Sequence, residues 1–195
     1  MKVIGISGSP RKEGNTEILI KKVFDVLEGK GINTELISLA DKKIQPCDAC
    51  KYCRKNIGKC HIQDDLAPIL EKILNADGII LASPVYFGSV TAQIKALIDR
   101  AGYIARGMDA PFRRKVAGAI VVARRGGHNF ALMQLLQFFS IFGMIIVGSA
   151  CYWNIAFGRE KGDVLKDEEG LQTIKDFAEN MAWILSCKSK NNFEF

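Results

Sequence analysis

The sequence predicts an α/β fold in which a parallel β-sheet is covered by helices on both faces. Short apolar runs, typical of strands buried on both sides, alternate along the chain with amphipathic segments at helical spacing. No internal repeat or low-complexity linker interrupts this alternation. We therefore expect a single domain over residues 1–195, which is long enough to bury a full core.

The first half of the chain predicts three strands and two helices. KVIGIS at 2–7 is the first strand, and apolar residues at helical spacing predict a helix over 16–28 that two glycines end. TELISL at 34–39 and DGIILA at 77–82 predict the next two strands. A helix over 64–75 lies between them, preceded by a cysteine-rich link.

The second half continues the same alternation. A helix over 91–101 leads to the apolar run KVAGAIVVA at 115–123. A helix over 128–142, a strand over 144–148 and a last helix over 171–186 follow. Five such strands predict a flavodoxin-like, doubly wound sheet in the order 2-1-3-4-5.

The loop after the first strand has the composition of an anion site. In an open parallel sheet, ligands bind beyond the carboxyl ends of the strands, where helix N-termini offer free N–H groups. Ser9, Asn15 and Thr16 supply polar side chains, and Arg11 supplies a charge. A plain turn with a helix cap would use the same residues. The loop is neither GxxxxGK[ST] nor GxGxxG, so ATP and adenine dinucleotides are less favoured as the tightly held ligand.

Two further loops lie at the same predicted edge. SPVYFGS at 83–89 offers aromatic area and backbone N–H groups to a flat ring, although a buried aromatic pair is the commoner explanation. The other loop is RRGGH at 124–128. One interpretation is that it brings an arginine or backbone amides to the pyrimidine side of such a ring, and the other is that it is a glycine turn with solvated arginines.

The segment 43–62, between the second strand and the next helix, predicts a metal centre. Its four cysteines are spaced CxxCxxC and then six residues apart: Cys47, Cys50, Cys53 and Cys60. Zinc ligands usually come in pairs, whereas this spacing favours one [4Fe–4S] cluster, and zinc stays the alternative. Cys151 and Cys187 have apolar neighbours and are expected to be small buried residues.

The charge is concentrated around the same segment. From Lys42 to Ile62, six basic residues face one acid, Asp48, and the resulting +5 is most of the net charge of +6. We therefore expect no nucleic-acid surface. The basic residues offset the thiolates, and Lys51, Arg54, Lys55 and Lys59 are also candidates for steering an acidic electron carrier.

Targeting signals are not evident in the sequence. The N-terminus does not resemble a signal peptide, and apolar runs are shorter than the roughly 18 residues of a spanning helix. Six cysteines without such a signal favour a reducing compartment. We expect a cytoplasmic protein with no membrane association.

Two segments of the chain resemble the NADPH-dependent FMN reductase family, which has a flavodoxin-like fold. They are GSPRKEGNT and, further along, SPVYFGSVTAQIKALIDR. With the four cysteines, the chain resembles the iron–sulfur flavoproteins, in which the corresponding cysteines hold a [4Fe–4S] cluster. The resemblance implies that the FMN phosphate is held by Ser9, Arg11, Asn15 and Thr16. It implies that the isoalloxazine is lined by Pro84, Val85, Tyr86, Phe87 and Gly88.

The resemblance also implies a function. Ferredoxin is the implied one-electron donor, oxygen or hydrogen peroxide are among the implied acceptors, and homodimers or homotetramers are implied assemblies. No catalytic acid or base is assigned, because the chemistry belongs to the cofactors. The alternatives are an NAD(P)H-dependent FMN or quinone reductase, with zinc or a structural cluster on the cysteines, and a non-enzymatic flavin-bound electron shuttle or regulator.

Overall fold

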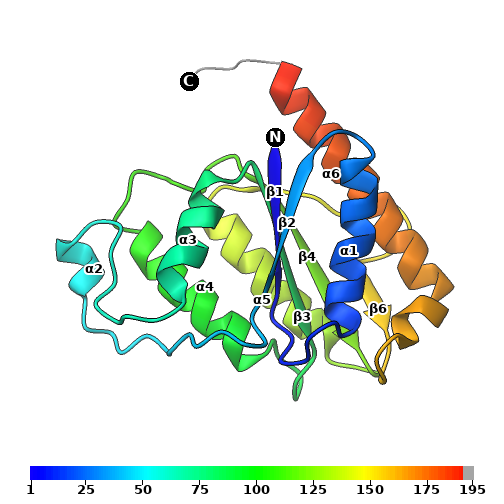
Figure 1. Ribbon diagram of the computed structural model, residues 1–195, viewed down its shortest axis with the longest axis horizontal. Coiled ribbons are helices and arrows are strands. Elements are labelled where there is room, and N and C mark those ends of the chain that lie inside the picture. Colours follow the sequence, from blue (N-terminus) through cyan, green and yellow to red (C-terminus); the bar gives the residue numbers. More distant parts are fainter. Residues whose placement is uncertain (191–195) are drawn as a thin grey trace.

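One parallel sheet organises the computed structural model of the chain, which describes residues 1–190. Its strands are β1 (Lys2–Ser7), β2 (Asn33–Ser38), β3 (Gly78–Pro84), β4 (Val116–Ala123), β5 (Ile145–Ile146) and β6 (Ile155–Phe157). They lie in the order β2-β1-β3-β4-β5 (Figure 1). The predicted flavodoxin-like order is confirmed.

The fifth position of the sheet is filled by two short strands. β5 pairs with Val116 and Ala117, and β6 pairs with the other end of β4, from Val121 to Ala123. Because β3 occupies the opposite edge of β4, β5 and β6 share one edge. The prediction of a strand over 144–148 was therefore right for two residues only, and β6, three residues long, was missed.

Helices cover both faces of the sheet. They are α1 (Asn15–Glu28), α2 (Tyr52–Lys55), α3 (Leu66–Asn75), α4 (Ala92–Ala105), α5 (His128–Ile141) and α6 (Glu168–Lys190), with a 3₁₀ turn, η1, at Asp163–Lys166. α1 and α6 pack on one face and α3, α4 and α5 on the other (Figure 1). α2 and η1 were not predicted, and α6 begins three residues before the predicted start.

Two apolar clusters explain why the strand runs are apolar throughout. In β1, Ile4 and Ile6 pack towards α3, α4 and α5, whereas Val3 packs towards α1 and α6. All eight residues of β4 are buried. Burying a branched side chain contributes about 1.5–3 kcal/mol, so these two layers stabilise the scaffold that carries the loops.

Two cysteines lie where the sequence did not predict them. Cys151 is exposed in the loop between β5 and β6, and Cys187, near the end of α6, is half-buried. The expectation of two buried residues was wrong. Cys151 is exposed because the loop from 147 to 154 leaves the sheet, and Cys187 lies on a part of α6 that the core covers only in part. Within residues 1–190, no helix combines the length and the apolar character needed to cross a membrane.

Candidate functional site

A cavity of about 300 Å³ opens at the carboxyl edge of the sheet, between the loops that follow β1, β3, β4 and β6. The first predicted loop contributes Ser9, Arg11, Asn15 and Thr16, and the second contributes Pro84, Val85 and Tyr86. The structure thus brings two segments about 70 residues apart to one cavity of the size that holds small ligands.

Buried hydrogen bonds fix the first loop against the sheet. The Gly8 N–H donates to the carbonyl of Ala82 at 2.7 Å, and the Thr91 hydroxyl donates to the Gly8 carbonyl at 2.6 Å. The loop ends at the N-terminus of α1, where no side chain caps the first turn. Free N–H groups at such a terminus favour an anion.

Residues 158–162 form a third wall of the cavity, which was not predicted from the sequence. The Asn15 side chain donates to the Glu160 carbonyl at 2.8 Å and accepts from the Gly162 N–H at 2.7 Å. A Cβ at Gly158 would lie 2.8 Å from the Asn15 amide nitrogen, so only glycine fits there. The composition GREKG directly after a strand was the available signal, but it required recognising β6.

The second loop is a tight hairpin turn. Tyr86 and Ser89 exchange backbone hydrogen bonds, and Phe87 and Gly88 at its tip have φ values of 48° and 79°. This turn points the Phe87 side chain fully into solvent, and neither tip residue lines the cavity. Of the five residues predicted for a ring, the structure therefore gathers Pro84, Val85 and Tyr86.

The third loop packs directly on the second. Gly127 has a φ of 83°, and a Cβ there would lie 2.9 Å from the Cα of Gly88. This close approach requires glycine. Arg124, at the start of the same loop, lines the cavity.

The cavity is strongly cationic. Five basic residues line it: Arg11, Lys12, Arg124, Arg159 and Lys161. Glu13 lies beside them, and its hydrogen bond and ion pair with Lys161 lower the pKa of its carboxyl. Cations together with Val85 and Tyr86 fit a ligand that combines an anionic group with a flat, largely apolar ring.

The four predicted cysteine ligands also come together. Cys47, Cys50, Cys53 and Cys60 line one small pocket of about 80 Å³ against α4. Ala49 and Lys51, between the first three, have left-handed φ values of 57° and 63°. These two residues bend the chain, so that the CxxCxxC run curls around the pocket. Four thiols on one pocket are the donor set of a cluster or a zinc ion.

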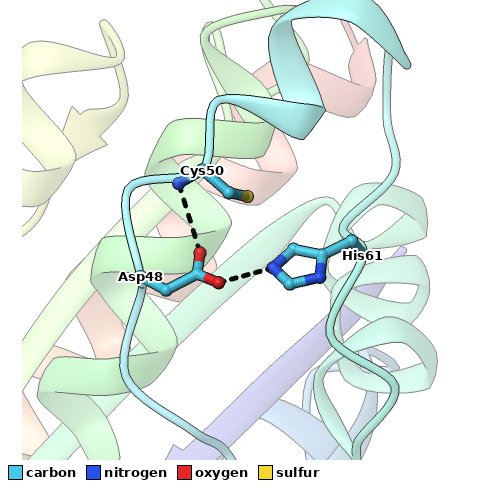
Figure 2. A group of neighbouring side chains, drawn as sticks. All are labelled: Asp48, Cys50 and His61. Atoms are coloured by element: carbon cyan, nitrogen blue, oxygen red, sulfur yellow. Dashed lines mark hydrogen bonds and ion pairs between the residues drawn. The ribbon is translucent and has the colours of Figure 1, made fainter.

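An exposed pair closes this segment (Figure 2). The His61 ring nitrogen lies 2.7 Å from a carboxylate oxygen of Asp48, and the Cys50 N–H donates to the other oxygen at 3.2 Å. The backbone N–H of Tyr52 acts to lower the pKa of the Cys50 thiol. Desolvation and Asp48 outweigh this effect, so the pKa is raised overall. The pair joins residues 13 positions apart, each of which directly follows a cysteine, Cys47 or Cys60.

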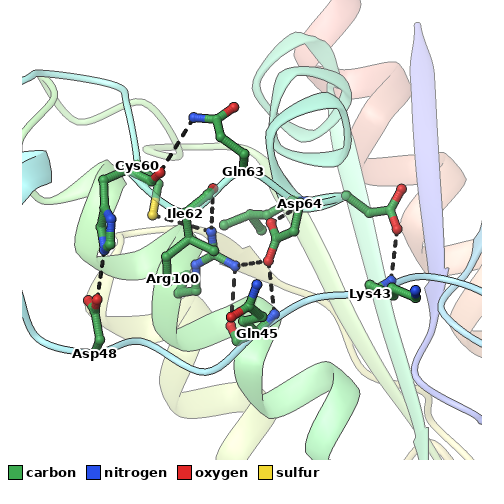
Figure 3. A network of polar contacts seen from close by, with 11 residues as sticks. Lys43, Gln45, Asp48, Cys60, Ile62, Gln63, Asp64 and Arg100 are labelled. Atoms are coloured by element: carbon green, nitrogen blue, oxygen red, sulfur yellow. Dashed lines mark hydrogen bonds and ion pairs between the residues drawn. The ribbon is translucent and has the colours of Figure 1, made fainter.

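Arg100 ties the cysteine segment to α4 (Figure 3). Its guanidinium forms an ion pair with Asp64 and donates to the carbonyls of Gln45 and Ile62, both at 3.2 Å. It also donates to the sulfur of Cys60 at 3.2 Å. Arg100 was not predicted from the sequence, although a cation among the apolar residues of a helix was a visible signal.

The two sites are separate within one chain. They share no lining residue, since one is built from the loops at the carboxyl edge and the other from the cysteine segment and α4. In Figure 1 the cysteine segment with α2 lies on the opposite side of the molecule from α6.

Comparisons with known proteins agree with this architecture. Residues 1–158 match the model of the family described as NADPH-dependent FMN reductase. An iron–sulfur flavoprotein of Methanocaldococcus jannaschii is 44% identical over 97% of this chain and all of that protein. One from Methanosarcina thermophila is 36% identical over 98% of both chains. The structure of RosB with bound 8-demethyl-8-formylriboflavin-5′-phosphate has a TM-score of 0.77 over 99% of this chain and 82% of RosB, at 18% identity.

The fold and these matches define a flavodoxin-like oxidoreductase. The chain belongs to the NADPH-dependent FMN reductase family, and within it to the iron–sulfur flavoproteins.

Proposed function

We propose that the protein transfers electrons from a one-electron donor to an acceptor, using a [4Fe–4S] cluster on the four cysteines and FMN in the cationic cavity. The single observation that carries this proposal is the presence of two separate sites, a four-thiol pocket and a cationic cavity, in one chain. When bound, the cluster would exchange single electrons and FMN would collect pairs of them. Oxygen or hydrogen peroxide are the acceptors we propose.

The chain's own residues would bind and orient the two groups. Arg11 and the N-terminus of α1 would hold the FMN phosphate, with Ser9 and Thr16 beside them. Asn15 would hold the cavity wall in place, since the nitrogen and the oxygen of its side-chain amide already bond the 160–162 segment. Val85 and Tyr86 would cover the ring.

We propose an acidic electron carrier such as ferredoxin as the donor. Lys51, Arg54, Lys55 and Lys59 are all exposed around the four-thiol pocket, and within residues 1–190 none of them pairs with an acid. Unpaired exposed cations beside a redox centre favour encounter with a negatively charged partner.

We also propose that the active form is a homodimer or homotetramer. The two sites of one chain share no lining residue, and in such an assembly the cluster of one chain would lie beside the flavin of a neighbour. Exposed aromatic side chains such as Phe87 and Tyr86 flank the cavity and would be covered in such an assembly.

The test is anaerobic stopped-flow reduction of the flavin by reduced ferredoxin, compared with NADPH. We expect ferredoxin to reduce it at a catalytic rate and NADPH to be slow. A Lys55→Glu, Lys59→Glu variant should slow reduction by ferredoxin by roughly tenfold at low ionic strength and flatten its salt dependence.

The matched control places the same charge change on the α1 and α6 side of the molecule, at Lys30 and Lys175, both exposed. This control should behave like the wild type. Fast bleaching of the flavin by NADPH with no response to ferredoxin would overturn the proposal and favour an NAD(P)H-dependent FMN or quinone reductase. That alternative has support from a protein of Bacillus subtilis, 30% identical over 88% of this chain and 93% of that protein, whose name is putative NAD(P)H-dependent FMN-containing oxidoreductase.

A further inference from the structure

The structure buries one cation against the proposed cluster ligands. The Arg100 side chain is 1% exposed, on the face of α4 that carries Leu97, Ala101 and Ile104 into the core. Removing a charge from water is unfavourable unless the protein supplies partners. The partners that Arg100 has therefore indicate why it is there.

All four of these partners flank or belong to the cysteine segment. One terminal nitrogen donates to the Gln45 carbonyl and to the Asp64 carboxylate (Figure 3). The other donates to the Ile62 carbonyl and to the sulfur of Cys60. The remaining donor, Nε, is buried and has no partner within residues 1–190. The guanidinium is thus neutralised by a single carboxylate, and it contacts one thiol directly.

The contact with Cys60 gains strength only when the sulfur carries negative charge. A neutral thiol is a weak acceptor, whereas a thiolate that ligates iron accepts a charge-assisted hydrogen bond. Arg100 also lines the same pocket as the four cysteines. Hydrogen bonds and positive charge next to a cluster favour its reduced form, because reduction adds negative charge.

We propose that Arg100 is a positioning residue that raises the reduction potential of the cluster through its N–H···S hydrogen bond to Cys60. The proposal rests on the proposed function, because it requires a cluster on the four cysteines. Asp64 opposes the effect, since its carboxylate partly neutralises the guanidinium that Cys60 meets.

The test is a redox titration of the purified holoprotein, in which the cluster is followed by electron paramagnetic resonance. In Arg100→Gln we expect the equilibrium constant for reduction to fall by about tenfold, which is about 59 mV for a one-electron couple. Arg100→Lys keeps the charge but loses the planar guanidinium with its several N–H donors. Its reduction potential should lie between that of Arg100→Gln and that of the wild type. Asp64→Asn should shift the potential the opposite way, upwards.

Lys59→Gln is the matched control, because it removes one positive charge next to Cys60 at an exposed position. Solvent screening should keep its effect below about threefold. A purely structural role predicts that Arg100→Gln and Asp64→Asn lower iron content and thermal stability while the remaining cluster keeps the wild-type potential. That result, or shifts of the same sign in both variants, would overturn the proposal.

If Arg100→Gln retains no iron, Asp64→Asn decides alone, since all Arg100 donors remain. An unchanged or lower potential in Asp64→Asn then overturns the proposal, and a raised potential supports it. Absence of iron and sulfide from the wild-type protein would instead overturn the proposed function itself.

Discussion

The cationic cavity and the four-thiol pocket are built in opposite ways. The cavity lies at the carboxyl edge of a sheet. Thr91 and Asn15, at the N-termini of α4 and α1, hold two of its loops, and Gly127 packs a third loop on the second. The pocket lies in the segment between β2 and α3, which contains only the four-residue helix α2 and no buried apolar residue from Lys42 to Asp65. The first site depends on the regular elements of the core. The second depends on polar contacts and on three partly buried residues that pack against the core from outside: Ile44, Cys53 and Cys60.

This contrast predicts how the two sites should respond to damage. No buried member of the two apolar clusters lies in the cysteine segment, so the flavin site should survive a change there. A change in the loops of the cavity should likewise leave the cysteines in place, because the two sites share no lining residue. Independent loss of each cofactor is therefore the expected pattern.

The largest expected effect is that of Cys53→Ala. Removing one of four ligands should abolish stoichiometric iron and sulfide binding, whereas FMN content should stay near the wild-type level. Metal and sulfide assays together with the flavin absorbance measure both. Cys151→Ala is the control, because Cys151 is exposed in a different loop, and it should retain both cofactors. Loss of FMN together with iron in Cys53→Ala would show that the two sites are not independent.

Asp64→Asn should have the next largest effect. Its carboxylate is 4% exposed and pairs with Arg100, so the substitution leaves a buried cation without its counter-ion. We expect the free energy of unfolding to fall by about 3 kcal/mol, measured with urea. Asp99→Asn on α4 removes an exposed pair with Lys95 and should cost about 0.5 kcal/mol or less. Equal losses in the two variants would contradict the role of the Arg100 contact.

The effect of Asp64 should also depend on pH. Burial acts to raise the pKa of Asp64, but hydrogen bonds from Arg100 and from the backbone N–H groups of Gln45 and Leu66 lower it overall. Because the pKa is lower in the folded state, its stabilisation is complete above the unfolded value of about 3.9 and is lost as the pH falls through the folded value. The difference in the free energy of unfolding between the wild type and Asp64→Asn should be constant from about pH 8 to pH 5 and should become smaller below about pH 4.

Asn15→Ala, at the cationic cavity, should have a smaller effect. The substitution removes two hydrogen bonds that hold the 160–162 segment, each contributing about 1 kcal/mol. The dissociation constant for FMN should rise by about tenfold, and iron content should not change. Fluorescence titration of the flavin-free protein measures this. Asn33→Ala, at the exposed start of β2, should bind FMN like the wild type, and a comparable loss there would contradict the assignment.

The regular elements could be predicted because strands and helices leave different patterns in the sequence, a short continuous apolar run for a strand and a 3.6-residue spacing for a helix. The apolar runs of β1, β3 and β4 and the helical spacing in α1 appear directly in the sequence. Under the rules for doubly wound parallel sheets, five such strands favour the order 2-1-3-4-5. The same rules place the loops after β1 and β3 at one edge. The ends of α4 and α6 extend beyond the prediction, because helix ends follow tertiary packing more than local pattern.

The missed features depend on contacts between distant residues. β6 is three residues long and is stabilised by pairing with β4, and the wall at 158–162 depends on Asn15, about 145 positions earlier. The cysteine spacing predicted a metal centre, but nothing local indicated that Arg100 would reach Cys60 from 40 positions away. The exposed orientation of Phe87 likewise follows from the turn geometry, which its sequence alone did not reveal.

The most direct test of the two-site assignment is the cofactor content of the purified wild-type protein. Iron, acid-labile sulfide and flavin should be counted against protein and compared with one visible spectrum. We expect about four irons, about four sulfides and one FMN per chain. One zinc ion per chain, without iron or sulfide, would contradict the cluster and with it the proposed electron path.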